Sequence, residues 1–242
     1  MGTVAVTFPS TDWSIVRRAT AQSTRTADGA IATLCERYWY PLYACLRHRG
    51  YDSADAEDLT QAFLASVVER NRRRRILPEQ GRFRAFIRTA LMNFAANQDR
   101  RGRAQKRGGG LRHVSDAFDP AEPRHACEPV DRSTPERVFD RSWAVALLNR
   151  VLVRLEEDYA SAGKAEIFQQ LQQALVGDPD RRSHADTAAA LAMSEAAVRV
   201  AVHRMRRRYR NLLRDEVGRT VSEPTAIDDE IRYLFAVVAS TG

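Results

Sequence analysis

The chain has 242 residues and carries 38 lysine and arginine residues against 31 aspartate and glutamate residues, a formal net charge of +7. A chain of this length can bury the core of one large domain or two small ones. The basic excess is mostly arginine and favours a polyanionic partner such as nucleic acid. No apolar run reaches the roughly 20 residues of a membrane-spanning helix, and no signal-peptide pattern opens the chain, so we expect no membrane association.

The cysteines and histidines suggest neither a disulfide nor a metal site. Cys35, Cys45 and Cys127 form no CxxC pair, which favours a reduced, cytoplasmic protein. His113, His125 and Cys127 would give a metal three ligands without a fourth, which is poor zinc spacing. The sequence also lacks a Gly-rich phosphate loop and a nucleophile elbow, so we expect no cofactor and no enzymatic activity.

The first half of the chain predicts three helices. Residues 1–26 are weakly patterned, with a short helix expected from about Pro9 to Val16. A helix over residues 28–47 buries Leu34, Tyr38, Leu42 and Cys45, and Pro41 should kink or split it.

A second helix, over residues 52–70, is apolar on one face and acidic on others. Its apolar positions are Ala56, Leu59, Phe63 and Val67. Its remaining positions include Asp55, Glu57, Asp58 and Gln61. Acids are favoured in first helical turns, which is one explanation of the patch. A second is docking on a basic protein surface. A third, a carboxylate metal or acid-base site, would need a histidine that is missing. Thr60 beside the patch is either a phosphorylation site that strengthens docking or an ordinary helix threonine.

The third helix, over residues 81–101, carries aromatic and polar residues on different sides. We expect a core face of Phe83, Phe86, Ile87, Ala90, Leu91 and Phe94. The exposed side should hold Arg84, Arg88, Asn93, Asn97 and Arg100. Amide and guanidinium donors with aromatic platforms bind bases of a melted strand, although the aromatics also fit a plain core. Residues 102–133 lose periodicity and predict a linker between two helical domains.

The second half begins with a capped helix and ends with a basic one. Thr134, Pro135 and Glu136 start a helix to about Ala160, which breaks near Gly163, and a shorter helix follows over 164–176. Residues 183–214 predict two helices joined by a tight turn at residues 192–194, with Ser194 as the cap of the second. The buried stripe of that helix is Val198, Val202, Met205, Tyr209 and Leu212.

The exposed side of this last helix is strongly basic. Seven arginines and no acid lie between Arg199 and Arg214. A helix-turn-helix in a DNA major groove has this composition, because early residues reach base edges and later cations grip phosphates. The base readers would be Glu195, Ala196, Arg199 and His203, and the phosphate contacts Arg204, Arg207 and Arg208. The alternative is an amphipathic hairpin with a solvated basic face.

A polar connection and a tail helix follow Val217. Its apolar face is expected to contain Ile227, Ile231, Leu234, Phe235 and Val238. We expect this tail helix to pack against the rest of the protein and not to act as a lid.

Three stretches together resemble the bacterial RNA polymerase sigma factors of the extracytoplasmic-function group. They are DAEDLTQAFL (residues 55–64), RFRAFIRTALMNFAANQDRR (residues 82–101) and the helix-turn-helix. The resemblance implies an all-α protein with two helical domains, called regions 2 and 4. It divides the chain into an N-terminal extension (1–26), a region 2-like domain (27–101), a linker (102–133), a region 4-like domain (134–217) and a tail (218–242).

The resemblance also implies sites and partners. Asp55, Glu57, Asp58 and Gln61 would dock on the coiled coil of the largest polymerase subunit. Promoter melting at the minus-10 element would use residues 77–81 and Arg84, Arg88, Asn93, Asn97, Arg100 and Arg101. The minus-35 element would be read by Ser194, Glu195, Ala196, Arg199, His203, Arg204 and Arg207. An anti-sigma protein or a kinase would act as regulator, unless the tail takes that role.

Two positions depart from the family pattern. Ala192 stands where the turn commonly has glycine, and alanine is expected to fit a helical position there; Phe86 stands where tryptophan is common. The second hypothesis for function is a stand-alone helix-turn-helix regulator, which would not use core polymerase. Transcription with purified core polymerase separates the two.

Overall fold

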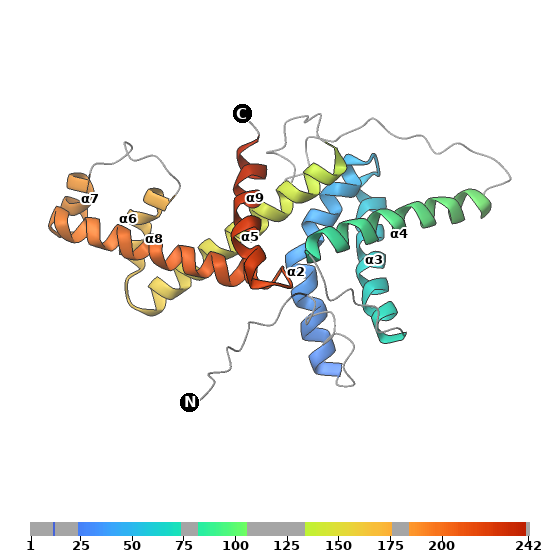
Figure 1. Cartoon of the computed structure of the whole chain (residues 1–242), viewed down its shortest axis with the longest axis horizontal. Helices are drawn as coiled ribbons and strands as arrows, with labels where there is room; N and C mark the ends of the chain where they lie inside the picture. Colours follow the sequence, from blue (N-terminus) through green and yellow to red (C-terminus); the bar gives the residue numbers. More distant parts are fainter. Residues whose placement is uncertain (1–11, 13–23, 74–81, 106–133, 176–183, 241–242) are drawn as a thin grey trace. The chain divides into compact units, whose positions relative to one another are not determined.

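The computed structural model describes residue 12 and residues 24–73, 82–105, 134–175 and 184–240 (Figure 1). Within these ranges the secondary structure is helical, with one isolated bridge between Arg82 and Val221, so the all-α prediction is confirmed. The chain divides into two compact units, one made of Met1–Ala146 with Gly218–Gly242 and the other of Leu147–Val217. The boundary between Val217 and Gly218 coincides with the expected start of the tail. The boundary between Ala146 and Leu147 falls inside a helix, whereas the sequence predicted the break between domains in the linker, residues 102–133.

The first unit contains the three predicted helices, the start of a fourth and the tail. They are α2 (Thr24–His48), α3 (Ser53–Arg73), α4 (Phe83–Gln105), the beginning of α5 (Pro135–Ser161), the short 3-10 helix η2 (Pro224–Ala226) and α9 (Ile227–Ala239). α2 packs against α3. Thr134 caps α5 as predicted, because its hydroxyl accepts from the Arg137 amide at 3.4 Å and its carbonyl from Val138 at 3.1 Å.

The predicted apolar stripes form the core of the first unit. The described side chains of α2 to α4 that are buried include Leu34, Tyr38, Leu42, Cys45, Ala56, Phe63, Phe83, Ile87, Leu91 and Phe94. Aromatic pairs join the helices: the rings of Tyr38 and Phe83 are 5.2 Å apart, and those of Phe63 and Phe94 are 5.6 Å apart. Tilted and edge-on pairs at such distances add stability beyond the area they bury.

Pro41 was expected to kink or split the first long helix, and the split does not occur. α2 runs through Pro41 as one element. Proline inside a helix removes a backbone hydrogen bond and costs about 3 kcal/mol. Burial of Tyr38, Leu42 and Cys45 on both sides of Pro41 stabilises the continuous helix and offsets that cost.

Asp12 is a buried acid that no sequence pattern identified. Its carboxylate accepts from Arg37 Nη1 and from the Tyr38 hydroxyl, each at 2.5 Å. Its amide donates to the Arg219 carbonyl at 2.6 Å. Asp12 thus ties α2 to the start of the tail segment within the first unit. The rest of the short helix expected over Pro9 to Val16 lies outside the described residues.

The two cysteines of α2 are expected to differ in reactivity. The Cys45 side chain is fully buried, its thiol donates to the Pro135 carbonyl at 3.2 Å, and burial raises its pKa to about 12. Cys35 is only half-buried, and burial raises its pKa to a smaller extent. Because the thiolate is the reactive form, alkylation of the native chain followed by peptide mass mapping should modify Cys35 well before Cys45. Equal rates would contradict the placement of Cys45, and denaturant should equalise them.

The second unit holds the remainder of α5 and four further elements. These are α6 (Ala165–Leu171), η1 (Gln172–Leu175), α7 (His184–Ala190) and most of α8 (Glu195–Gly218). The predicted break after α5 is confirmed: Gly163 has a φ of +69°, and the next amide, that of Lys164, donates back to the Tyr159 carbonyl at 2.8 Å. Among the helices described, none is both long and apolar enough to cross a membrane.

Candidate nucleic-acid interface

The acidic face of α3 is defined by Asp55, Glu57, Asp58 and Gln61. Glu57, Asp58 and Gln61 are exposed and Asp55 is partly exposed. Asp52 fixes the start of this helix, because its carboxylate accepts from the Asp55 amide at 2.7 Å. The residues expected to touch a protein partner therefore reach solvent on one rigid helix.

Thr60 lies beside the acidic face but points into the core. Its side chain is fully buried, and its hydroxyl donates to the Ala56 carbonyl at 2.7 Å. A buried hydroxyl with this bond is closed to a kinase. The phosphorylation hypothesis is therefore contradicted, and Thr60 is an ordinary helix threonine.

The donor face of α4 consists of Asn93, Asn97, Arg100 and Arg101. All four residues are exposed, and their spacing of three and four places them on one side of the helix. Two amides and two guanidinium groups give this side many hydrogen-bond donors.

Arg84 and Arg88, expected on the same exposed side, are instead part of an ion cluster with Arg82, Asp140 and Glu230. Arg84, Asp140 and Glu230 are its buried members, Arg88 is partly buried and Arg82 is exposed. Arg84 is only 3% exposed. Its Nε and Nη2 donate to the two carboxylate oxygens of Glu230, the latter at 3.2 Å, and its Nη1 donates to Asp140 Oδ1 at 3.0 Å. Arg88 donates to Asp140 Oδ2 at 2.6 Å, and Arg82 Nε lies 2.8 Å from Glu230 Oε2.

Aromatic rings complete the ion cluster. The Arg84 guanidinium carbon lies 4.1 Å from the ring centre of Tyr233 and 5.4 Å from that of Trp143. The Tyr233 hydroxyl donates to Asp140 at 2.6 Å. Burial works against the charged form of Arg84, but the hydrogen bond to Glu230 and the charges of Glu230 and Asp140 outweigh it and raise the pKa of Arg84. Arg84 is therefore inaccessible to DNA in this arrangement, and the prediction that it lies on the exposed side is wrong.

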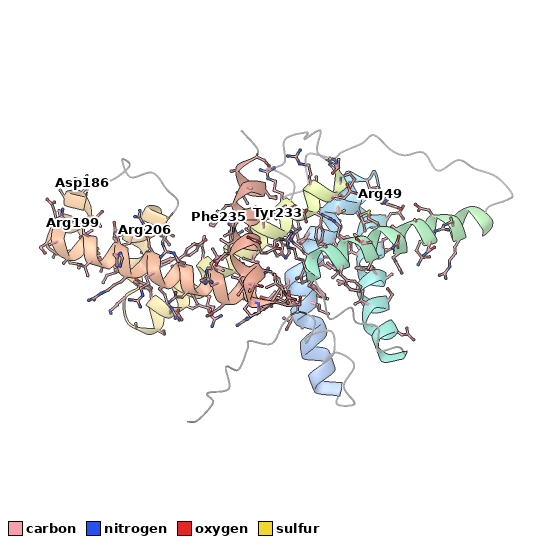
Figure 2. All side chains as sticks on the ribbon, viewed as in Figure 1. Arg49, Asp186, Arg199, Arg206, Tyr233 and Phe235 are labelled. Atoms are coloured by element: carbon pink, nitrogen blue, oxygen red, sulfur yellow. The ribbon has the colours of Figure 1, made fainter. Side chains whose placement is uncertain are left out.

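The tail helix supplies Glu230 from its expected apolar face, and one residue expected on that face is exposed. Glu230 is 0% exposed beside the buried Leu234, whereas Phe235, expected in the core, is 47% exposed. Tyr233 and Phe235 are marked on α9 in Figure 2. Glu230 follows Ile227 by three residues and precedes Leu234 by four, so it lies on their stripe. A carboxylate on an apolar stripe was the sequence signal for a buried cation partner.

The turn between α7 and α8 has well-defined caps at both helix ends. The Met193 amide donates to the Ala188 carbonyl at 2.9 Å and the Ala192 amide to the Ala189 carbonyl at 3.3 Å, which is the Schellman pattern. Ser194 caps α8 as predicted, since its hydroxyl accepts from the Ala197 amide at 3.2 Å. In the sequence Ser183 and Asp186 have the spacing of a capping box for the first of these helices, but Ser183 lies outside the described residues.

Ala192 takes a conformation that favours glycine. Its φ is +50°, in the left-handed region, so the expectation that alanine fits a helical position here is wrong. Left-handed geometry costs an L-residue about 1–2 kcal/mol.

Replacing Ala192 by glycine is accordingly expected to stabilise the turn by about 1 kcal/mol. Amide hydrogen exchange of the α7 and α8 segments, followed by mass spectrometry, should slow. The matched control is Ala189→Gly inside α7, where glycine should instead cost about 1 kcal/mol and speed exchange. The same sign for both substitutions would contradict the geometry of the turn.

The face of α8 opposite its core is basic and open. Val198, Val202, Met205 and Leu212 are buried as predicted, and Tyr209 is half-buried. The exposed residues comprise the whole predicted set, Ser194, Glu195, Ala196, Arg199, His203, Arg204 and Arg207. Figure 2 shows Arg199 near the α7 end of α8 and Arg206 farther along it.

Arg208 is also exposed, but it has a protein partner. Its Nη2 lies 2.6 Å from Asp158 Oδ2 on α5, within the second unit. An exposed pair of this kind contributes little free energy, so it does not exclude Arg208 from contact with a phosphate.

Several predicted features lie outside the described residues. They are the loop 77–81, the linker, and His113, His125 and Cys127. In the part of the chain that the structure describes, no group of three or more histidine, cysteine or acidic side chains is placed to hold a metal ion.

Comparison of the chain with protein-family models, with curated proteins and with solved structures gives no match.

Proposed function

We propose that the chain is a sigma factor, a subunit that binds core RNA polymerase and directs it to promoters without chemistry of its own. The observation that carries this proposal is the exposure, on one chain, of an acidic face on α3 and of a basic face on α8 that has no acid from Arg199 to Arg214. One surface suits a basic protein and the other suits DNA. The cytoplasm, where transcription takes place, is the matching location.

Core polymerase is the proposed partner of the acidic face. Asp55, Glu57 and Asp58 place up to three negative charges at the start of α3, in a chain whose net charge is +7. Complementary charge across an interface speeds encounter and fixes register. The motif DAEDLTQAFL that carries this face is the one that resembles the polymerase-docking helix of sigma factors.

The donor face of α4 is the proposed contact with the melted minus-10 strand. Asn93, Asn97, Arg100 and Arg101 offer donors to exposed bases and phosphates. Arg84 and Arg88 are left out of this proposal, because Asp140 and Glu230 already bind their guanidinium groups.

The α7–α8 pair is the proposed helix-turn-helix that reads the minus-35 element. In this motif the second helix enters the major groove with its N-terminal residues against base edges. A cap by Ser194 leaves Glu195, Ala196 and Arg199 in the first turns, where such contacts are made. The later arginines can then reach phosphates.

Arg199→Ala is expected to cost about 1–3 kcal/mol of binding to the cognate promoter and to relax sequence preference, since arginine pairs with guanine edges. Arg208→Ala is the matched control and should weaken binding to all duplexes alike, as the loss of a phosphate contact does. Fluorescence anisotropy titrations with cognate and scrambled duplexes separate the two. An equal loss on both duplexes for Arg199→Ala would reduce Arg199 to a phosphate contact.

Transcription from core polymerase alone tests the proposal. Purified core enzyme of the source organism is supplied with templates whose upstream region is randomised, with and without the chain. A sigma factor should yield discrete new transcripts. A stand-alone regulator, the second candidate, would bind duplex DNA through α8, yield no transcript with core, and leave the acidic face of α3 without a role.

A further inference from the structure

Val200 is a large apolar side chain on the exposed side of α8. It is 49% exposed. Single exposed valines are common and usually need no explanation. The neighbours of Val200 make this position different.

One arginine, one histidine and one small residue lie beside Val200. Helical spacing places Ala196, His203 and Arg204 there, and all three are exposed. The small Ala196 side chain leaves the valine methyl groups open on the N-terminal side. An apolar protein partner would have to remove water from the Arg204 guanidinium and the His203 ring, which is costly. A polyanion that presents an apolar group would satisfy both the arginine and the valine.

The major groove of DNA offers such a group. The thymine C5-methyl projects into the groove and is the apolar feature that side chains read there. Val200 lies about 7.5 Å along α8 from Glu195, given a rise of about 1.5 Å per residue. In a helix-turn-helix the N-terminal residues of the second helix contact base edges, and Val200 lies within the first two turns of α8, whereas Arg210 lies about 22 Å from Glu195, far from that end.

We infer that Val200 contacts a thymine methyl group in the upstream promoter element and selects thymine at one base pair. The inference rests on the proposed use of α8 to read duplex DNA. It adds a specificity-determining residue to the hydrogen-bonding set of Arg199 and His203. Cytosine and uracil lack the methyl group, so the contact distinguishes thymine from both.

Val153 provides a matched control. It is also a valine on a helix of the second unit and is 53% exposed. Two exposed acids, Glu156 and Glu157, lie one turn on and the exposed Arg154 follows it directly, so this surface lacks the arginine excess of α8. The two valines differ in the charge that surrounds them.

The test removes single methyl groups from DNA. Duplexes that the full chain binds, alone or with core polymerase, are selected from a randomised pool, and each thymine is then replaced in turn by uracil. For the wild-type chain, one replacement should weaken binding about fourfold, the effect of about one buried methyl-sized group. Val200→Ala should bind the thymine and uracil forms of that duplex equally, while Val153→Ala should respond like wild type.

Each comparison is internal to one variant, so a general loss of affinity cannot imitate the expected result. Alanine is also the better helix former, and Val200→Ala should leave the helical circular dichroism signal unchanged. If Val200→Ala keeps the wild-type response to uracil at every position, the inference is overturned, while promoter-dependent transcription from core would leave the proposed function intact. Failure of the wild-type chain to select any duplex would overturn the inference. If core polymerase supplied with the wild-type chain also yields no new transcript, the proposed function is overturned as well.

Discussion

Glu230→Ala is expected to destabilise the first unit by about 3–5 kcal/mol, because it leaves Arg84 buried with one of its two carboxylate partners missing. A loss of this size is a large share of the 5–15 kcal/mol that typical domains have in total. Trp39 and Trp143 both belong to the first unit, so their fluorescence during urea unfolding reports on that unit.

The neighbouring residue Asp229 is the matched control. Its carboxylate pairs with Arg232 at 2.6 Å, but both side chains are mostly exposed. Asp229→Ala should therefore change stability by less than about 0.5 kcal/mol. Similar effects for Asp229→Ala and Glu230→Ala would contradict the burial of Glu230 in the ion cluster.

A double substitution checks the cause of the loss. Arg84→Met combined with Glu230→Leu should recover part of the stability that Glu230→Ala removes, since an apolar pair replaces a buried ion pair without leaving a lone charge. No recovery would indicate that Arg82, Arg88 and Asp140 depend on Arg84 for their own arrangement.

Asp58→Arg is expected to weaken binding to core polymerase by about 2–4 kcal/mol, which is about 30-fold or more. The substitution reverses one charge in the acidic face and sets it against the basic docking surface that we propose for core polymerase. The fold should be unaffected, because the position is exposed and arginine is a good helix former. Pull-down on immobilised core enzyme with quantified input measures the effect.

Glu156→Arg makes the same charge change at an exposed position of α5 in the second unit. It should leave core binding within about twofold of wild type, because it lies outside the acidic face. Parallel losses for Asp58→Arg and Glu156→Arg would mean that overall charge, and no particular face, governs the association.

Local patterns were enough to predict much of the fold. The stripes through Tyr38, Phe63, Ile87 and Val202 repeat every three to four residues, and all four side chains are buried. The caps Thr134 and Ser194 depend only on the next few residues, and both form as expected. The period of a helix is visible in sequence because its cause is local.

The errors involve partners far away in the sequence. Arg84 pairs with residues 56 and 146 positions away, and no helical period reveals such a partner. By period alone Arg84 is a polar residue on the exposed side of an amphipathic helix. The left-handed Ala192 depends on the Schellman bonds that close α7, so an alanine that looks helical in sequence is strained in the turn.

The exposed site residues were more predictable than the buried ones. Asp58, Asn97 and Arg199 are polar residues that fall outside the apolar stripes of their helices, and all three are exposed in the structure. Asp12 could not be found in this way, because it lies in a weakly patterned stretch and its partners Arg37 and Tyr38 lie on another helix. Burial of polar groups depends on tertiary pairing, which sequence period does not encode.

Photocrosslinking tests the assignment of one face to protein and another to DNA most directly. A photoreactive amino acid is placed at Gln61 in one variant and at His203 in another, both at exposed positions. Each variant is then irradiated in a complex with core polymerase and promoter DNA. The Gln61 variant should form adducts with the largest polymerase subunit and the His203 variant with upstream duplex DNA. Adducts of the Gln61 variant with DNA, or of the His203 variant with polymerase alone, would contradict the proposed division between the acidic face of α3 and the basic face of α8.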